Sequence, residues 1–411
     1  MHSMQLAEPP ADARPAAPGI AARTRRCGTG AHDDAVGADP ARSAALRRAC
    51  APVVPFLLQL GAAASCLVPA PALAHVKWFA PFDVAEPPMP IHGVLTPRFL
   101  LVFAGFALLM AGGFLLDRLA ARSGRGGVLA QRGREEVEER LVRAGTGAFF
   151  MALFTAGGVI LTPELKTGAE WPAWLQLGVA ASMLSARSCI LGAAGILALY
   201  GYGAALYGAF HIADYPVFLG LAAYLALTSC APGRWRALRM PVLHAAVCAS
   251  LMWASVEKWA YPQWTFPLLE ARPWLTFGIL PSDFMVVAGF VEFAFAFHIL
   301  TGFGLSRLGI LGLGAIFAAA ILDFGKLDAI GHLPILAAMA AMFVHGPTPL
   351  QRRLHDIRRG LLAEARRAGL AFAAAICVFV SAYYGLQRAE HGHGQHARKP
   401  TVLAEAPRGA R

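Results

Sequence analysis

Ten apolar blocks, separated by polar gaps, follow one another between Arg98 and Gln387. Each block is long enough, or nearly so, for a helix to cross the hydrocarbon layer, because a helix rises about 1.5 Å per residue. The pattern predicts an all-α protein, a polytopic transmembrane helical bundle of about ten spans. The spans are expected at 98–116, 147–162, 171–186, 188–208, 216–230, 241–261, 283–303, 308–323, 330–345 and 368–386.

Basic residues lie in every second gap between these blocks, and this alternation predicts the orientation of the chain. Eighteen arginines lie in the gaps on one side, against five lysines or arginines on the other before the C-terminal tail. Arginine-rich gaps face the cytoplasm. We therefore expect a multi-pass protein of the bacterial inner (cytoplasmic) membrane, with both mature termini in the periplasm. The net charge of +11 is explained by this placement, so the lipid bilayer is the expected partner and nucleic acid is not.

The N-terminal end precedes the first span and has two parts. Residues 1–45 are rich in Ala, Arg, Pro and Gly, have no apolar period, and are expected to be a disordered extension. Residues 46–74 have the basic, apolar and Ala-x-Ala order of a signal peptide. Cleavage after Ala74 would make His75 the first mature residue, and an uncleaved anchor is the alternative.

The remaining chain divides according to the spans. Residues 117–146 are expected to contain a short cytoplasmic helix, because Glu136–Arg140 and Glu139–Arg143 are spaced as helical ion pairs. The other expected segments are a short periplasmic segment at 75–97, the first five transmembrane helices within 98–230, a basic cytoplasmic loop at 347–367, the last transmembrane helix at 368–386, and a His-containing periplasmic tail at 387–411.

Ionisable residues inside membrane spans are costly, and they are therefore the first candidates for a functional site. The candidates for catalysis or binding are Glu257, Lys258, Glu292 and His332. Two interpretations stay open. Glu292, with Lys258 or His332, could bind a polar head such as a quinone carbonyl or relay protons. Alternatively, a buried Glu–Lys pair neutralises itself and only locks the helices together.

Three short motifs in residues 241–346 resemble the DoxX-like family of bacterial membrane proteins. They are Ser255-Val256-Glu257-Lys258-Trp259, Ala288-Gly289-Phe290-Val291-Glu292 and Gly331-His332-Leu333-Pro334. The resemblance implies a four-helix membrane core over this quarter of the chain. It also implies an accessory subunit of a redox or quinone-linked system, with a respiratory or redox membrane complex as partner and quinone as the cofactor. The cysteine pairs of thiol-active relatives are absent, and no reaction is carried over, so whether the chain is an enzyme stays open.

Histidines in the predicted periplasmic segments suggest an alternative, a copper-handling membrane protein. A mature N-terminal His75 would offer an amine and an imidazole to copper, a metal that imidazoles suit. The remaining candidate metal ligands are His92, His391, His393 and His396. Their spacing is typical of flexible chelation rather than of a closed tetrahedral site.

A small-solute transporter is the third alternative, ranked last because no inverted repeat or broken helix pair stands out in the sequence. Three further residues have expected structural roles. Asp214 precedes the fifth span and is expected to cap its helix. His244 and His345 lie near the inner ends of their spans and are expected at the membrane interface.

Overall fold

A computed structural model describes residues 76–122, 135–230, 233–356 and 360–392 of the chain. The predicted all-α class is confirmed: these residues form helices joined by loops, and no strand occurs among them beyond one isolated bridge between Val159 and Lys166. Seven of the helices are long and apolar enough to cross a membrane. The chain is therefore a multi-pass membrane protein, and the count of ten spans stays a prediction.

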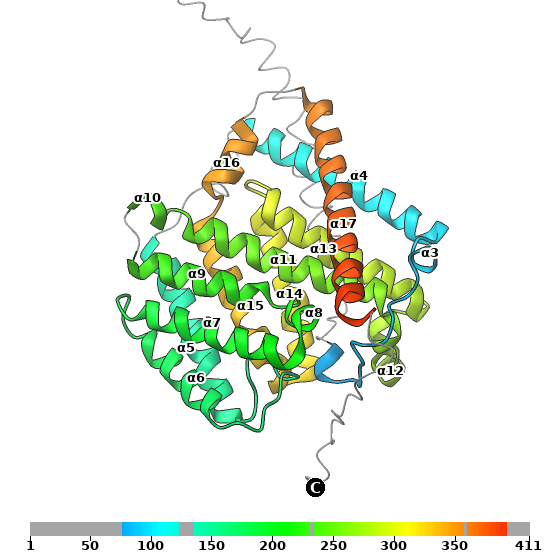
Figure 1. Ribbon diagram of the computed structural model, residues 1–411. Coiled ribbons are helices and arrows are strands. Elements are labelled where there is room, and N and C mark those ends of the chain that lie inside the picture. The colour runs from blue at the N-terminus through cyan, green and yellow to red at the C-terminus, as the bar shows by residue number, and fades with distance from the viewer. Residues whose placement is uncertain (1–75, 123–134, 231–232, 357–359, 393–411) are drawn as a thin grey trace, which may run out of the picture. The chain divides into compact units, whose positions relative to one another are not determined.

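The seven long apolar helices carry the labels of Figure 1. They are α4 (Pro97–Arg122), α7 (Cys189–Tyr207), α11 (Arg239–Ala260), α13 (Pro281–Thr301), α14 (Ser306–Phe324), α15 (Lys326–His345) and α17 (Leu361–His391). The other helices are η1 (Val76–Trp78), α3 (Ile91–Val94), α5 (Glu135–Ala156), α6 (Trp171–Ser182), α8 (Ala209–Ile212), α9 (Pro216–Cys230), α10 (Gly233–Arg236), η3 (Pro262–Trp264), α12 (Phe266–Ala271), η4 (Pro273–Thr276) and α16 (Pro349–Asp356).

The second predicted span differs most from the structure. Instead of 147–162, the helix is α5, which begins at Glu135 and ends at Ala156. Gly157 and Gly158 both adopt positive φ, which ends the helix before the apolar residues that follow. The predicted cytoplasmic helix is therefore the first half of α5, and its predicted pairs, Glu136–Arg140 and Glu139–Arg143, are both present.

Two other helices are short. The helix α6 has 12 residues and α9 has 15, which correspond to lengths of about 18 and 22 Å, against a hydrocarbon layer of about 30 Å. The predicted loop at 347–367 is also partly helical, because α16 lies within it and α17 begins at Leu361. Residues 1–74, with the predicted extension and signal, lie outside the described residues.

The helices differ in how much of their surface the protein covers. The apolar window of α4 is only 6% buried and that of α17 only 17%, whereas that of α11 is 72% buried. Large apolar side chains such as Leu101 and Leu108 of α4 and Leu370 of α17 are more than 60% exposed. Exposed apolar surface of this extent is what lipid contact requires. The helix α11 therefore lies inside the bundle, and α4 and α17 lie at its edge.

Eight helices form two groups of four that pack along one shared interface. In the first unit α5 packs on α6, α6 on α7, and α7 on α9; in the second, α11 packs on α13, α13 on α14, and α14 on α15, with α11 also touching α15. The units meet where α9 packs on α11 and α5 packs on α15 (Figure 1). We call this interface the seam. Both α5 and α11 begin at the same end of it, because Arg239 pairs with Glu138.

The two units repeat the same local geometry between their third and fourth helices. In each, a glycine with positive φ ends the third helix and directly precedes the next: Gly208 after α7 and Gly325 after α14. A proline follows eight or nine residues later, Pro216 and Pro334 respectively. Pro334 lies inside a continuous α15, whereas Pro216 begins α9 after the short α8. A run of four helices ends on the side where it began, so the second unit starts on the same side as the first. The two units therefore form a parallel repeat.

Small residues allow the two units to approach each other closely. A Cβ atom added at Gly145 of α5 would overlap Ala337 of α15, and one added at Gly220 of α9 would overlap Ala246 of α11. Membrane helices associate through such small-residue contacts, because lipid supplies no hydrophobic driving force between them. Each of the two helix pairs in the seam thus packs a glycine against an alanine.

We expect Gly145→Leu and Gly220→Leu each to destabilise the protein in detergent by about 1–3 kcal/mol, because the added side chain would force the units apart. The matched control is Gly201→Leu, at an α7 position with no atom within 4 Å of an added Cβ. Thermal unfolding of the purified variants measures the effect. Equal melting temperatures for all three variants would show that the seam does not depend on these glycines.

Candidate functional site

A buried lysine joins three parts of the chain at one end of the seam. Lys77 Nζ lies 2.5 Å from Asp214 Oδ2 and 2.6 Å from Glu257 Oε2. Lys77 belongs to η1, Asp214 to the loop before α9 in the first unit, and Glu257 to the last turn of α11 in the second. All three side chains are at most 7% exposed. Burial alone would lower the pKa of Lys77, but the two carboxylates raise it above its usual value, so the ammonium stays charged.

The segment that carries Lys77 is fixed to the second unit by further contacts. Trp78 packs against the His332 ring at a centroid distance of 5.0 Å, and a Cβ atom added at Gly331 would overlap the indole. Tyr261 Oη donates to the Glu86 carbonyl at 2.7 Å. The glycine of the Gly331-His332 motif is therefore required to seat the tryptophan that follows Lys77.

Glu164 forms the first-unit side of this cluster. It lies in the loop after α5, is 9% exposed, and accepts a hydrogen bond from the Tyr215 hydroxyl. Burial raises the pKa of Glu164 from its ordinary value of 4.5 to about 7. Burial likewise raises the pKa of Asp214 to about 7, against the opposing effect of Lys77. Both carboxyl groups lie in loops outside the membrane-spanning helices, and both change charge near neutral pH.

A small cavity lies beside Lys77, between the two units. Its volume is about 40 Å³, which is room for about three water molecules. All four residues selected from the sequence, Glu257, Lys258, Glu292 and His332, line this cavity. The first unit contributes Asp214, Tyr215 and Thr162 among other residues. The structure thus brings the four candidates together around one cavity and adds residues from the other unit.

Lys258 and Glu292 form a second ion pair at the cavity, 2.5 Å between Nζ and Oε2. Their side chains are 16% and 15% exposed, more than any group in the Lys77 triad. Gly289, one turn before Glu292, allows this contact, because a Cβ atom there would overlap Trp259 of α11. The motif that contains Gly289 and Glu292 therefore holds α13 close enough for its carboxylate to reach α11.

His332 contacts a carboxylate and two aromatic rings. Its Nδ1 lies 3.1 Å from Asp328 Oδ2, one turn earlier on α15, and Asp328 is fully buried. Its ring stacks on Phe317 at 4.6 Å and contacts Trp78.

The predicted metal ligands do not gather in the described residues. His92 is exposed on α3, and His391, the last residue of α17, packs its ring against Phe210. His75, His393 and His396 lie outside the described residues. Within the described part of the chain, no group of three or more His, Cys, Asp or Glu residues could hold a metal ion.

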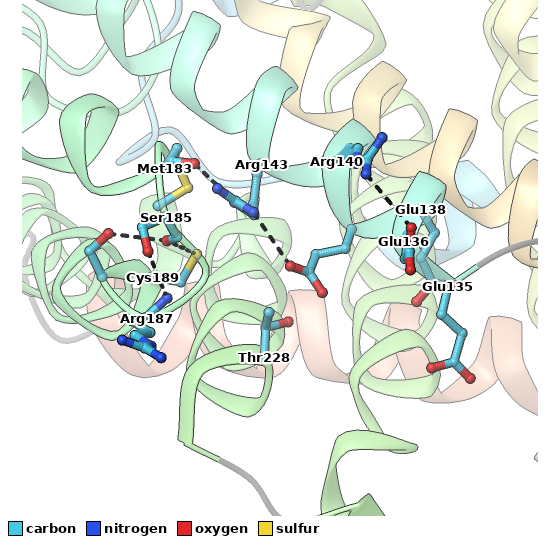
Figure 2. A network of polar contacts seen from close by, with 12 residues as sticks. Glu135, Glu136, Glu138, Arg140, Arg143, Met183, Ser185, Arg187, Cys189 and Thr228 are labelled. Atoms are coloured by element: carbon cyan, nitrogen blue, oxygen red, sulfur yellow. Dashed lines mark hydrogen bonds and ion pairs between the residues drawn. The ribbon is translucent and has the colours of Figure 1, made fainter.

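A second charged cluster lies at the other end of the seam. Glu138 of α5 pairs with Arg239 of α11 at 2.8 Å and accepts a hydrogen bond from His345 of α15. Glu139 pairs with Arg236, Arg239 and Arg143. Figure 2 shows Arg143 of this cluster also pointing at the carbonyl of Met183, to which its Nε donates at 2.9 Å.

His244 and His345 are buried within the protein, and their expected place at the membrane interface stays a prediction. They are 4% and 3% exposed, and they lie inside the seam because α9 and α5 cover the second unit at that end. Asp214 was expected to act as a helix cap, and its carboxylate instead binds Lys77, as described above. Sequence reasoning missed the Lys77–Asp214 pair, whose members are 137 residues apart. The only signal was a lone lysine in an otherwise apolar and aromatic stretch.

Comparison of the chain with protein-family models, with curated proteins and with solved structures finds no match.

We expect Lys77→Met to destabilise the protein by about 3–5 kcal/mol, because it leaves two buried carboxylates without a counter-charge. Adding Asp214→Asn and Glu257→Gln should restore part of that loss by removing the uncompensated charges. Lys166→Met is the matched control, since Lys166 is exposed. The melting temperatures of the wild type and of the three variants measure the effect. A Lys77→Met protein as stable as Lys166→Met would contradict the role of Lys77 as the counter-charge.

We expect stability to fall as the pH rises from 4.5 to about 7. In that range buried Glu164 holds a proton that the unfolded chain has already released, so a higher pH favours the unfolded state. Above about pH 7 Glu164 is ionised in both the folded and the unfolded state, so its contribution to stability no longer changes with pH. Glu164→Gln should make the slope shallower and leave the contribution of Asp214, which has the same sign, whereas Glu170→Gln, at an exposed position of the same loop, should leave the slope unchanged. Melting temperatures across this pH range measure the slope, and an unchanged slope in Glu164→Gln contradicts the assignment.

Proposed function

We propose that the chain is an accessory subunit of a redox system in the bacterial inner membrane, and that it exchanges protons with a membrane partner at Lys258 and Glu292. One observation carries the proposal: this ion pair lies on a cavity large enough for water and remains partly exposed. The side chains of Lys258 and Glu292 are 16% and 15% exposed, against at most 7% for those of the Lys77 triad.

The helix packing agrees with the family that residues 241–346 resemble. The helices α11, α13, α14 and α15 pack consecutively, and the contact of α11 with α15 closes the group. DoxX-like proteins share a four-helix core, and some of them are subunits of quinone-linked systems. The resemblance supports the redox context of the proposal, and the cavity supports the proton chemistry.

The enclosed cavity does not fit a quinone. A ring with two carbonyl oxygens and its substituents is larger than the space of about 40 Å³, which suits a few waters. Among the groups on this cavity, the Lys258 ammonium and the Glu292 carboxylate can donate and accept a proton. We therefore assign the electron-carrying cofactor to the partner, and proton exchange to this chain.

Reduction of an organic carbonyl cofactor takes up protons together with electrons, so a partner of this kind needs a proton donor in the membrane. In this proposal the Lys258–Glu292 pair is that donor, with the ammonium and the carboxylate in contact at 2.5 Å. Water in the cavity would restore the proton. The proposal places both mature termini in the periplasm, with the cavity at the periplasmic end of the seam.

We expect Glu292→Gln to lower oxygen uptake by membranes of the native host at least about tenfold, within the range by which a positioned acid or base affects rates. Asp283→Asn is the matched control on the same helix, because its ion pair with Arg98 is largely exposed. The proposal fails if alanine at both Glu292 and Lys258 leaves oxygen uptake intact and the chain still purifies with the same partners.

A further inference from the structure

The seam carries titratable groups at both of its ends. At one end are the cavity and the Lys77 triad, and at the other Glu138 contacts His345, with His244 nearby on α11. On α15 the two ends are marked by His332 and His345, thirteen residues apart, a rise of about 20 Å. Ionisable groups at membrane depth are costly, and proton and ion routes are among the functions that they mark.

The two units contribute matching positions to the cavity. Asp214 lies two residues before Pro216, and His332 lies two residues before Pro334, and both line the cavity. The residues that follow the two prolines, Val217 and Ile335, line it as well. A cavity built from equivalent positions of two parallel repeats lies on the axis that relates them. Membrane transporters built from repeats bind their substrates at this place.

The surroundings of the cavity are short of positive charge. Asp214, Glu257 and Glu292 line it directly, and two more carboxylates contact lining residues, Glu164 through Tyr215 and Asp328 through His332. The neighbouring cations are only Lys77 and Lys258. Carboxylates outnumber the lysines around this cavity, so its walls attract positive charge.

The volume of the cavity and the polar groups on its wall fit water. The space of about 40 Å³ has room for about three molecules. The Thr162 hydroxyl and the Asp214 carboxylate on its wall are groups that can form hydrogen bonds with water. The ligand that fits the volume, the charge and this hydroxyl is a hydrated proton.

The opposite end of the seam opens to the surface. A cleft of about 540 Å³, lined by Glu135, Glu136, Glu139, Arg236 and Arg239, lies next to Glu138. Between the two ends the seam helices bury apolar side chains, among them Leu225 of α9, Val247 of α11 and Ala338 of α15, all fully buried. Such a layer blocks proton movement until it becomes wet.

We infer that the seam is a path for protons across the membrane, entered at one end through the cavity at Asp214 and His332 and at the other through Glu138 and His345. In each step one O–H or N–H bond breaks and another forms, so the path is unchanged after each proton has passed. The inference deepens the proposed function, because it names the proton as the species that the cavity carries. It rests on the proposed function only for the source of the protons.

The test is proton flux through the purified full chain in vesicles of phosphatidylethanolamine and phosphatidylglycerol, with a pH-sensitive dye inside and a potassium diffusion potential as the driving force. We expect wild-type vesicles to change internal pH at least about tenfold faster than protein-free vesicles, as a positioned relay would allow. Equal rates in the two preparations would overturn the inference.

Three substitutions should return the rate toward that of protein-free vesicles: Asp214→Asn, His345→Gln and Thr162→Val. Asp214→Asn leaves Lys77 paired with Glu257, and Thr162→Val keeps the shape of the side chain while it removes the hydroxyl, so both variants should fold. Asp283→Asn, on the exposed ion pair, is the control and should conduct like wild type. Wild-type flux in both Asp214→Asn and His345→Gln would show that protons do not use the seam.

A variant with increased proton flux distinguishes loss of the path from misfolding, because a misfolded protein would not gain flux that depends on Asp214. Val247→Ala makes room in the apolar layer and should raise the rate, and Asp214→Asn added to it should abolish the increase. An increase that persists in the double variant is leakage and counts against the path. The failure of this inference is distinguishable from the failure of the proposed function. Proton flux can vanish in His345→Gln, at the end of the seam away from Lys258 and Glu292, while oxygen uptake and partner capture persist.

Discussion

The contact of Lys77 with Asp214 and Glu257 is the constraint on which the rest of this structure depends. It joins the N-terminal segment to both four-helix units at once, through charges that almost no solvent reaches. Such a buried ion cluster is costly to form and costlier to break, so it favours a single arrangement of the three parts.

The most polar of the long helices is also the most covered. The apolar window of α11 has the lowest mean hydropathy of the seven, 1.3, and the highest buried share. Its Arg239, Glu257 and Lys258 each have a carboxylate or ammonium partner from another element. Polar groups survive at membrane depth only where protein shields them from lipid. The outer helices α4 and α17 supply the apolar surface that α11 lacks.

The sequence predicted those features that depend on residues close together in the chain, such as the positions of most helices. The predicted helices between Cys189 and His345 match the structure within about four residues, whereas the last helix, predicted at 368–386, is longer at both ends. The pairing of Glu292 with Lys258 was one of the two expected interpretations, because each residue is costly alone in a span. The end of α5 was wrong, since two glycines ended an apolar run that looked helical. Lys77–Asp214 and Glu138–His345 could not be predicted, because each joins distant segments whose proximity is set only by packing of the two units.

The repeated geometry around Gly208 and Gly325 has a consequence for how such a chain can arise. A single four-helix unit on its own would leave the seam face uncovered, so it would need a second subunit of the same kind. Fusing both into one polypeptide fixes their stoichiometry and removes the requirement for identical faces. An aspartate in one half can then oppose a histidine in the other, an asymmetry that a symmetric homodimer could never encode.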